Sequence, residues 1–355
     1  MTQSIKSENI FQTKTPLYIC TKMKNMQTKY FLGATLAIFF AACGTSPKES
    51  NDDTNAKTEV AKIVLPEFDA DSAYMWVKAQ CDFGPRIPGT KAHADAVTFL
   101  SGKLKTYTDT VIIQKAPVKT FDGKAFTMQN IIASFNPSNT NRVLLCAHFD
   151  TRPWADGEET DKYKPFMSAD DGPTGAAVLI EVARQLQKQN TQLGVDIILF
   201  DMEDYGQEQD DTRYPQQENT WCMGSQYWAR NPHVKPYNAR YGILLDMVGG
   251  QNAVFPLEGT SLQYAPSQQR TIWDAANSLG FSNFTYAQTN PTIDDHLYIN
   301  TIAGIPTVDI VHYDISKSGY AFWHHRQSDT MQNIDAKTLK QVGQTILYVL
   351  SQTAL

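Results

Sequence analysis

Apolar and polar positions follow two alternating patterns from about residue 64 to the carboxyl terminus. Short continuous apolar runs, rich in β-branched residues, are typical of strands that are covered on both faces. Longer stretches repeat apolar residues at helical spacing, as in Leu339, Val342 and Ile346, and indicate amphipathic helices. The predicted strands are 110–113, 130–135, 143–147, 195–200, 241–246 and 307–311. The predicted helices are 72–80, 91–106, 175–189, 225–230, 267–279 and 335–352.

Interleaved strands and helices predict an α/β fold. We expect a single domain over residues 61–355, because the chain shows neither an internal repeat nor a second linker. Its core is expected to be a mostly parallel, twisted central sheet with helices on both faces. Ligands of such sheets gather beyond the carboxyl ends of the strands, so functional residues are expected there.

The amino-terminal segment has a different pattern. Lys24 and Lys29 precede the apolar run 31–42, which is shorter than the roughly 20 residues that span a bilayer. Residues 1–42 are therefore predicted to be a leader with a signal peptide. Residues 1–22 carry no targeting feature, and Met23 or Met26 is a more natural start than Met1.

The apolar run ends in Phe40-Ala41-Ala42-Cys43-Gly44, which resembles the lipobox of bacterial lipoproteins. This resemblance implies lipidation at Cys43, with residues 43–60 as a flexible polar tether. The alternative is an ordinary signal peptide that is cut after Ala42. Either case predicts export, and the lipobox predicts a bacterial membrane lipoprotein on the periplasmic side or cell surface, with membrane contact only through the lipid.

Composition and charge narrow the class of protein. With 42% hydrophobic and 19% charged residues the chain is globular, and its net charge is −6. The first 42 residues contain five Lys and one Glu, so the remaining chain carries −10. This acidic balance argues against nucleic-acid binding. Cys81, Cys146 and Cys222 remain in the domain; in an oxidising compartment they allow one disulfide at most, and the sequence does not choose the pair.

Acids and imidazoles follow the predicted strands at the points where the strands end. His148 follows 143–147, Glu203 and Asp204 follow 195–200, Asp246 ends 241–246, and Asp171 opens a helix. A single acid at a strand end usually caps the next helix. Several of them at one edge of a sheet would repel each other unless a cation neutralised them. Oxygen and imidazole ligands of this kind predict a catalytic Zn²⁺ site.

Several segments resemble, in order and spacing, a known clan of enzymes. They are AHFDTRPWAD (147–156), SADDGPTGAAVLIEVAR (168–184), ILFDMEDYG (198–206), LLDMVGG (244–250), DDHLYI (294–299) and WHHRQSDT (323–330). They resemble the zinc aminopeptidases and, within that clan, the glutaminyl cyclases (glutaminyl-peptide cyclotransferases) of the bacterial and animal secreted type. The resemblance implies a zinc aminopeptidase-like fold and peptidase-like chemistry of the site.

The resemblance also implies a role for individual residues. The implied metal ligands are Asp171, Asp204 and His325; the catalytic carboxylates are Glu203, Asp246 and Asp294; the candidates for a second metal or for support of the ligands are His148 and Asp150; and the substrate-binding residues are Trp323 and His296. His325 is preferred over His324 because the pattern is His, three residues, Asp, which His325 and Asp329 satisfy. The Trp-His adjacency of the cyclases favours His324 instead.

Three functions follow from this set of residues. The first is an acyltransferase that converts the N-terminal Gln of peptides or proteins to pyroglutamate and releases ammonia, with one zinc ion to polarise the γ-carbonyl and Glu203 as general base and acid. The second is a zinc aminopeptidase with two ions, for which Asp171 would be the bridge. The third is a binding lipoprotein without catalysis, whose signature would be a missing ligand. The residues alone leave the number of metals and the oligomeric state open.

Overall fold

The structure, a computed structural model, describes residues 66–189, 193–317 and 319–354, which belong to one compact unit, Ala61–Leu355. The predicted leader, Cys43 and the tether lie outside the described residues. No helix in the described part of the chain is long and apolar enough to cross a membrane. The three cysteines of this part, Cys81, Cys146 and Cys222, are buried free thiols, so none of them forms the disulfide that the sequence allowed.

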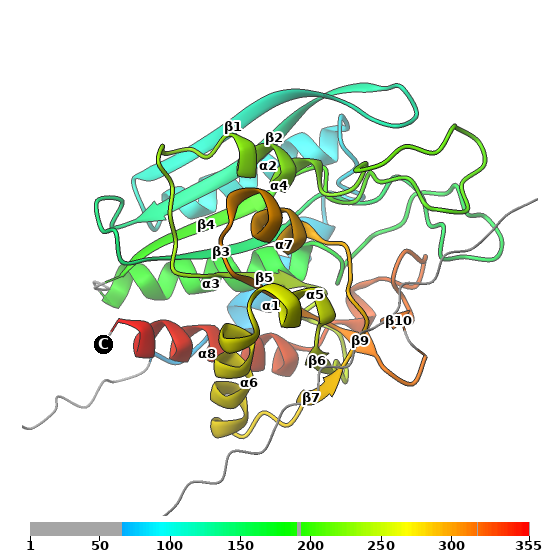
Figure 1. Ribbon diagram of the computed structural model, residues 1–355. Coiled ribbons are helices and arrows are strands. Elements are labelled where there is room, and N and C mark those ends of the chain that lie inside the picture. The colour runs from blue at the N-terminus through cyan, green and yellow to red at the C-terminus, as the bar shows by residue number, and fades with distance from the viewer. Residues whose placement is uncertain (1–65, 190–192, 318, 355) are drawn as a thin grey trace, which may run out of the picture. The chain divides into compact units, whose positions relative to one another are not determined.

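The elements follow one another as the alternating pattern predicts (Figure 1). The strands are β1 (Thr110–Lys119), β2 (Ala125–Phe135), β3 (Arg142–His148), β4 (Gly194–Phe200), β5 (Gly242–Asp246), β6 (Phe255–Leu257), β7 (Phe284–Gln288), β8 (Thr307–Val311), β9 (Tyr313–Asp314) and β10 (Gly319–Tyr320). The helices are α1 (Ala70–Cys81), α2 (Lys91–Lys105), α3 (Pro173–Gln189), α4 (Met223–Arg230), α5 (Gly259–Tyr264), α6 (Pro266–Ser278), α7 (Asp295–Tyr298) and α8 (Ala336–Thr353), with a π-helical turn at Ile299–Ala303 and a 3₁₀ turn at Met331–Asn333.

The central sheet has six strands in the order β1-β2-β4-β3-β5-β8. Strands β4, β3, β5 and β8 pair in parallel, whereas β2 is antiparallel to both β1 and β4. The sheet is therefore mostly parallel, as predicted. Because the parallel strands point the same way, the loops that follow β3, β4 and β5 leave from one edge of the sheet, on the right-hand side of Figure 1.

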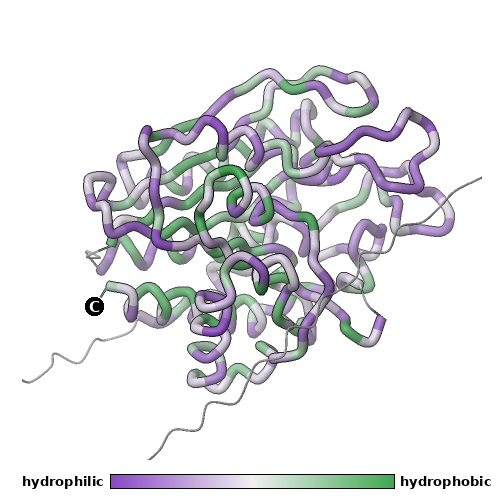
Figure 2. Tube along the Cα trace, in the orientation of Figure 1, coloured by the Kyte–Doolittle hydropathy of each residue, from purple (hydrophilic) through white to green (hydrophobic). Residues whose placement is uncertain are grey.

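Helices cover both faces of this sheet because successive strand residues point to opposite sides. Leu145, Ile197 and Ile243 pack with α1, α2, α3, α6 and α8 in the larger core. Their neighbours Leu144, Ile198 and Leu244 pack on the opposite face against Trp228 of α4 and Ile299. The central strands accordingly form hydrophobic segments, and the loops at the carboxyl edge are mostly polar (Figure 2). This arrangement confirms the predicted fold class.

The prediction missed parts of the fold that lack a strong pattern. Strands β1 and β2 extend as a hairpin to Lys119 and from Ala125, beyond the predicted ends, and this extension alternates buried with exposed positions. The short elements α5, α7, β6 and β7 are three to six residues long. Runs of this length carry too few periods for a pattern to be recognised.

Helix α3 packs on the sheet through Gly175, and this contact yields a test of the packing. A Cβ atom at position 175 would lie 2.2 Å from the carbonyl oxygen of Leu245 and 2.8 Å from the Cβ of Ala147. Gly175→Ala is therefore expected to lower the free energy of unfolding by about 1–3 kcal/mol, because neither the backbone oxygen nor the strand can move aside freely.

The matched control is Gly102→Ala in the exposed part of α2, where a Cβ would meet no described atom within 4 Å. This substitution is expected to raise stability by roughly 0.5–1 kcal/mol through helix propensity. Urea unfolding followed by circular dichroism measures both. Equal stability changes in the two variants would contradict the close packing of α3.

Candidate functional site

The loops at the carboxyl edge of the sheet enclose a cavity of about 680 Å³. They are the segments between β3 and α3, after β4, before α7 and after β10, together with Asp246 at the end of β5. The cavity wall includes predicted site residues and further side chains: Glu203, Asp204, Asp246, Asp294, His325, Arg152, Asp156, Trp221, Ile293, Tyr320 and His324. The sheet thus brings together residues that lie more than 120 positions apart in the sequence.

Asp171 lies between two imidazoles at the floor of this site. Its Oδ1 is 3.0 Å from Nε2 of His148, and its Oδ2 is 3.6 Å from Nε2 of His325. Asp171 is buried, and its Oδ2 has no hydrogen-bond partner among the described residues. The two oxygens of one carboxylate therefore face two separate groups of ligands.

The first group, the His325 half-site, consists of Asp171, Asp204 and His325. Nε2 of His325 is 3.0 Å from Oδ1 of Asp204, and Nδ1 of the same ring is 3.2 Å from Oδ1 of Asp156. Burial alone would lower the pKa of His325, but Asp204 and Asp156 raise it to about 10. Burial alone would raise the pKa of Asp204, but His325 holds it well below its usual value.

The second group, the His148 half-site, consists of Asp171, Asp246 and His148. Nε2 of His148 is 3.2 Å from Oδ1 of Asp246, and Nδ1 is 3.5 Å from Oδ1 of Asp150. Asp150 thus lies behind the imidazole, on the side away from Asp171. It also accepts the backbone N–H groups of Glu203 and Asp204 at 3.1 and 3.3 Å.

Backbone geometry holds the site residues in place. Asp329 accepts the backbone N–H groups of Asp170 and Asp171 at 2.9 and 3.3 Å, as Asp150 does for the loop after β4. Met202, Met247 and His325 have φ of 59°, 47° and 53°, each at or beside a predicted site residue. The left-handed region costs a residue with a side chain roughly 1–2 kcal/mol. This strain at three points of the site is typical of functional loops.

Glu203 is a buried carboxyl beside the His148 half-site. Its Oε2 is 4.0 Å from Nδ1 of His148, and its Oε1 accepts a hydrogen bond from the thiol of Cys222 at 3.1 Å. Burial raises the pKa of Glu203 well above its usual value, with the neighbouring Asp204 and Asp294 acting in the same direction. A carboxyl with a raised pKa can both accept and donate a proton near neutral pH.

Negative charge is in excess throughout the cluster. Burial, followed by Asp204, raises the pKa of Asp171 to about 6. Burial and Asp246 raise the pKa of Asp294 well above its usual value. Carboxyls of this kind keep their charge only where a cation compensates it. The oxygen and imidazole donors and the unpartnered Oδ2 of Asp171 suit a zinc ion. His148, Asp171 and Asp246 offer ligand atoms within 4.8 Å of one another, and Asp204 lies 3.0 Å from His325 in the other half-site.

The structure gives the two histidines after β10 different surroundings. His325 contacts Asp171, Asp204 and Asp156, as described above. The ring of His324 stacks on that of His325 at 3.7 Å and lies 4.7 Å from the ring of Tyr320. His324, His325 and Asp171 still offer ligand atoms within 4.8 Å of one another.

The two residues that the resemblance assigned to the substrate lie away from the cavity wall. Trp323 donates its indole N–H to Asp170 at 3.0 Å and lines a second cavity beside His312. His296 is buried and pairs with Glu258 through Nε2 at 3.0 Å. Neither is among the described residues that line the 680 Å³ cavity.

Three residues that touch the predicted ligands were not predicted. Asp156 contacts His325, Trp221 stacks on the same ring at 6.2 Å with an interplanar angle of 6°, and Arg152 is bound to Asp156 and Asp204. Arg152 and Asp156 stand in the segment 147–156 that carries the resemblance, so their position in that motif was the available signal. No sequence pattern distinguishes Trp221 as a contact of the site.

Comparison with known proteins adds a family and several relatives. Residues 130–350 match the model of peptidase family M28. The structure of glutaminyl cyclase from Bacteroides thetaiotaomicron bound to N-acetylhistamine is 46% identical, covers 81% of this chain and 98% of its own, and has a TM-score of 0.78. A leucine aminopeptidase precursor from Bacteroides thetaiotaomicron is 45% identical, covers 81% and 98%, and has a TM-score of 0.77.

Curated relatives match over shorter parts of their length. The glutaminyl-peptide cyclotransferase of Boiga irregularis is 24% identical over 252 residues, which are 62% of this chain and 64% of that protein. Aminopeptidase YwaD of Bacillus subtilis is 26% identical over 236 residues, which are 63% of this chain and 45% of that protein. The chain thus spans about half to two thirds of the length of these relatives.

The position of His325 between three carboxylates predicts which histidine binds the metal. His325→Gln is expected to lose zinc from the His325 half-site, because it removes the nitrogen that faces Asp204. His324→Gln is expected to keep the wild-type zinc content. Zinc per chain after dialysis, measured by mass spectrometry, tests this, and loss of zinc in His324→Gln with retention in His325→Gln would reverse the assignment.

Proposed function

The chain belongs to peptidase family M28, and we propose that within this family it is a zinc-dependent glutaminyl-peptide cyclotransferase. The observation that carries the proposal is the similarity to solved glutaminyl cyclases over almost the whole length of those enzymes. The geometry supports it, because the implied ligands and carboxylates meet around one cavity. The proposed substrates are peptides or proteins that begin with Gln.

The proposed reaction closes a ring within the substrate. The α-nitrogen forms a bond to the carbonyl carbon (Cδ) of the Gln side-chain amide, and the bond from that carbon to the amide nitrogen breaks to release ammonia. Both reacting groups belong to one residue, so the enzyme gains little from bringing them together and must instead manage charge and protons. A zinc ion held by Asp171, Asp204 and His325 would supply Lewis acidity toward the γ-carbonyl oxygen.

Glu203 is placed to move the proton. It takes one proton from the neutral α-amine as the new bond forms and delivers it to the departing nitrogen, so the carboxylate is regenerated in each cycle. Its burial and raised pKa suit both steps. The carboxyl of Asp294 lies beside it, since Glu203, Cys222 and Asp294 offer atoms within 4.8 Å of one another.

Asp246 and Asp294 are proposed to hold the α-amine. Both line the cavity and are buried, and each raises the energy of a second negative charge nearby. We propose that the two carboxyls share a proton, because burial and Asp246 raise the pKa of Asp294 well above its usual value, and that the amine donates a hydrogen bond to the oxygen that stays charged. The aromatic and apolar side chains of Trp221, Tyr320 and Ile293 form the wall that would enclose the Gln side chain.

A zinc aminopeptidase with two ions is the second candidate. The observation in its favour is the position of Asp171 between His148 and His325, with Asp246 and Asp204 completing one half-site each. The bridging water of such a site would be activated by Glu203. One zinc ion is proposed for the cyclase and two for the aminopeptidase.

Export and lipidation are separate parts of the proposal. We propose that Cys43 carries the lipid and that the enzyme acts outside the cytoplasm, held at a bacterial membrane by that anchor. The support for this is the apolar run 31–42 followed by the lipobox-like residues that end in Cys43.

Two peptides separate the candidate reactions. With a Gln-initiated peptide the enzyme is expected to release ammonia, and with a Leu-initiated peptide it is expected to release no free Leu. Ammonia and free amino acid are measured in parallel with the zinc content. Free Leu together with two zinc ions per chain would replace the cyclase with the aminopeptidase, and no product from either peptide would exclude both enzymes.

Glu203→Gln tests the proton transfer. The variant keeps the size of the side chain but removes the base, so kcat for ammonia release is expected to fall by about 10²–10⁴-fold. Zinc content is expected to stay unchanged, since Glu203 is not a proposed ligand. Asp210→Asn is the control, because Asp210 is an exposed carboxylate that lines the same cavity. A fall of less than tenfold in Glu203→Gln would contradict its role.

A further inference from the structure

Arg152 lies in the loop after β3 and is completely buried. A guanidinium has five N–H donors in one plane, and those of Arg152 are directed at the loops around the site. Nε donates to both carboxylate oxygens of Asp156, at 2.9 and 2.8 Å, and Nη2 also bonds to Asp156. Nη1 donates to the carbonyl oxygens of Asp204 and Gly206 at 2.9 and 3.1 Å.

These contacts lead to two of the three residues of the His325 half-site. Asp156, which Arg152 holds by its fork, contacts Nδ1 of His325 at 3.2 Å. Arg152 binds Asp204 directly, with its side chain on the carbonyl oxygen and with its backbone N–H on Oδ2 at 3.1 Å. Oδ1 of Asp204, the other oxygen, faces His325. The side chain of Arg152 thus acts on the ring of His325 through Asp156 and on the main chain of Asp204, and the backbone N–H of Arg152 holds the carboxylate of Asp204.

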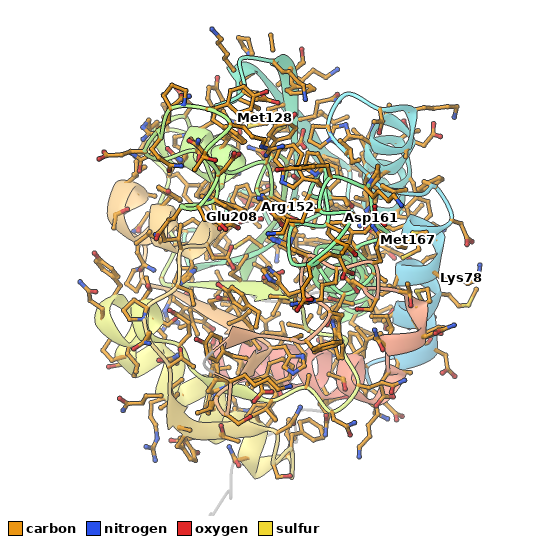
Figure 3. All side chains as sticks on the ribbon, turned by 90° about the vertical axis from the view of Figure 1, so that its right-hand side faces the viewer. Lys78, Met128, Arg152, Asp161, Met167 and Glu208 are labelled. Carbon is orange, nitrogen blue, oxygen red and sulfur yellow. The ribbon has the colours of Figure 1, made fainter. Side chains whose placement is uncertain are left out.

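Aromatic stacking adds a third link. The guanidinium carbon of Arg152 is 4.5 Å from the centre of the Trp221 ring, and Trp221 lies parallel to the ring of His325. Trp221 is also part of the cavity wall. Figure 3 shows Arg152 beside Glu208, which belongs to the same cavity wall. Oε1 of Glu208 is 3.7 Å from Nη2 of Arg152.

The cost of burying these charges indicates that Arg152 orients neighbouring groups rather than stabilises the fold. Removing a guanidinium and a carboxylate from water costs several kcal/mol per ion, and their attraction recovers this only with good geometry. Apolar side chains could fill the same volume at less cost. A buried, forked ion pair that ends on the ring of a proposed ligand is typical of the groups that orient metal ligands.

We propose that Arg152 is the positioning residue of the zinc site formed by Asp171, Asp204 and His325. It orients the ring of His325 through Asp156 and Trp221. It orients Asp204 by binding the main-chain carbonyl oxygen of that residue. The inference rests on the proposed zinc-dependent function but not on the reaction catalysed. Lys cannot replace Arg here, since an ammonium has no planar fork and cannot reach Asp156 and two carbonyl oxygens together.

The test is the zinc affinity of Arg152→Lys. Zinc is titrated into metal-free protein in competition with a chromophoric chelator, and the zinc Kd is expected to rise by about 10–100-fold. The matched control is Arg142→Lys, which alters another buried guanidinium, paired with Asp196 at 2.9 Å at the beginning of β3. The control is expected to keep the wild-type zinc Kd. A zinc Kd of Arg152→Lys within twofold of wild type would overturn the proposal.

Asp156→Asn provides a second variant should Arg152→Lys fail to fold. It keeps the size of the side chain and weakens the link from Arg152 to His325, so the zinc Kd is again expected to rise at least tenfold. Because the two residues act through the same link, the double variant is expected to lose less affinity than the product of the single losses. Independent, multiplicative losses would contradict the shared link.

These measurements separate the inference from the proposed function. If the Gln peptide gives no ammonia while Arg152→Lys still weakens zinc binding, the cyclase proposal fails and the positioning role of Arg152 stands. If the cyclase is active and the zinc Kd of both single variants equals that of wild type, the positioning role of Arg152 fails and the cyclase proposal stands.

Discussion

Buried negative charge at the carboxyl edge of the sheet is the constraint on which the rest of the structure depends. Asp204, Asp246, Glu203 and Asp294 are buried and line one cavity, and Asp171 is buried beside His325 of the same wall. Two imidazoles, His148 and His325, compensate only part of this charge, and the pKa of Asp171 is raised to about 6. Such a cluster is stable only if it binds a cation or holds protons. The proposed reaction requires both the cation and the protons, because the cation is its Lewis acid and one carboxyl must exchange a proton.

The fold meets this constraint with backbone groups as well as with side chains. Asp150 and Asp329 each accept two consecutive backbone N–H groups, and in this way they fix the loop after β4 and the turn before α3. The ligands are therefore held by groups that do not themselves face the cavity. The parallel sheet adds to this support because several of its strands end at one edge. The close approach of α3 through Gly175 fixes the helix that follows Asp171.

The sequence predicts the regular part of this arrangement well and the irregular part poorly. The central strands are continuous apolar runs, so they and the edge where their acids meet could be predicted. Asp156 and Trp221 contact His325 only because long loops bring them there, and no periodicity encodes a loop conformation. The roles of Trp323 and His296 were carried over from the resemblance, and the structure puts both behind the cavity wall, on Asp170 and Glu258. A motif identifies which residues matter, but the rotamer and the partner decide what each one touches.

The two half-sites around Asp171 are held in place by different groups. The ring of His325 is held on its far side by Asp156, which is itself held by the buried fork of Arg152. The ring of His148 has Asp150 on its far side, and Asp150 is itself held by two backbone N–H groups, while Asp246 beside the ring interacts with Asp294 as well. In the proposed cyclase, the His325 half-site would therefore hold the ion, and the half-site of His148 and Asp246 would bind the amine and its proton.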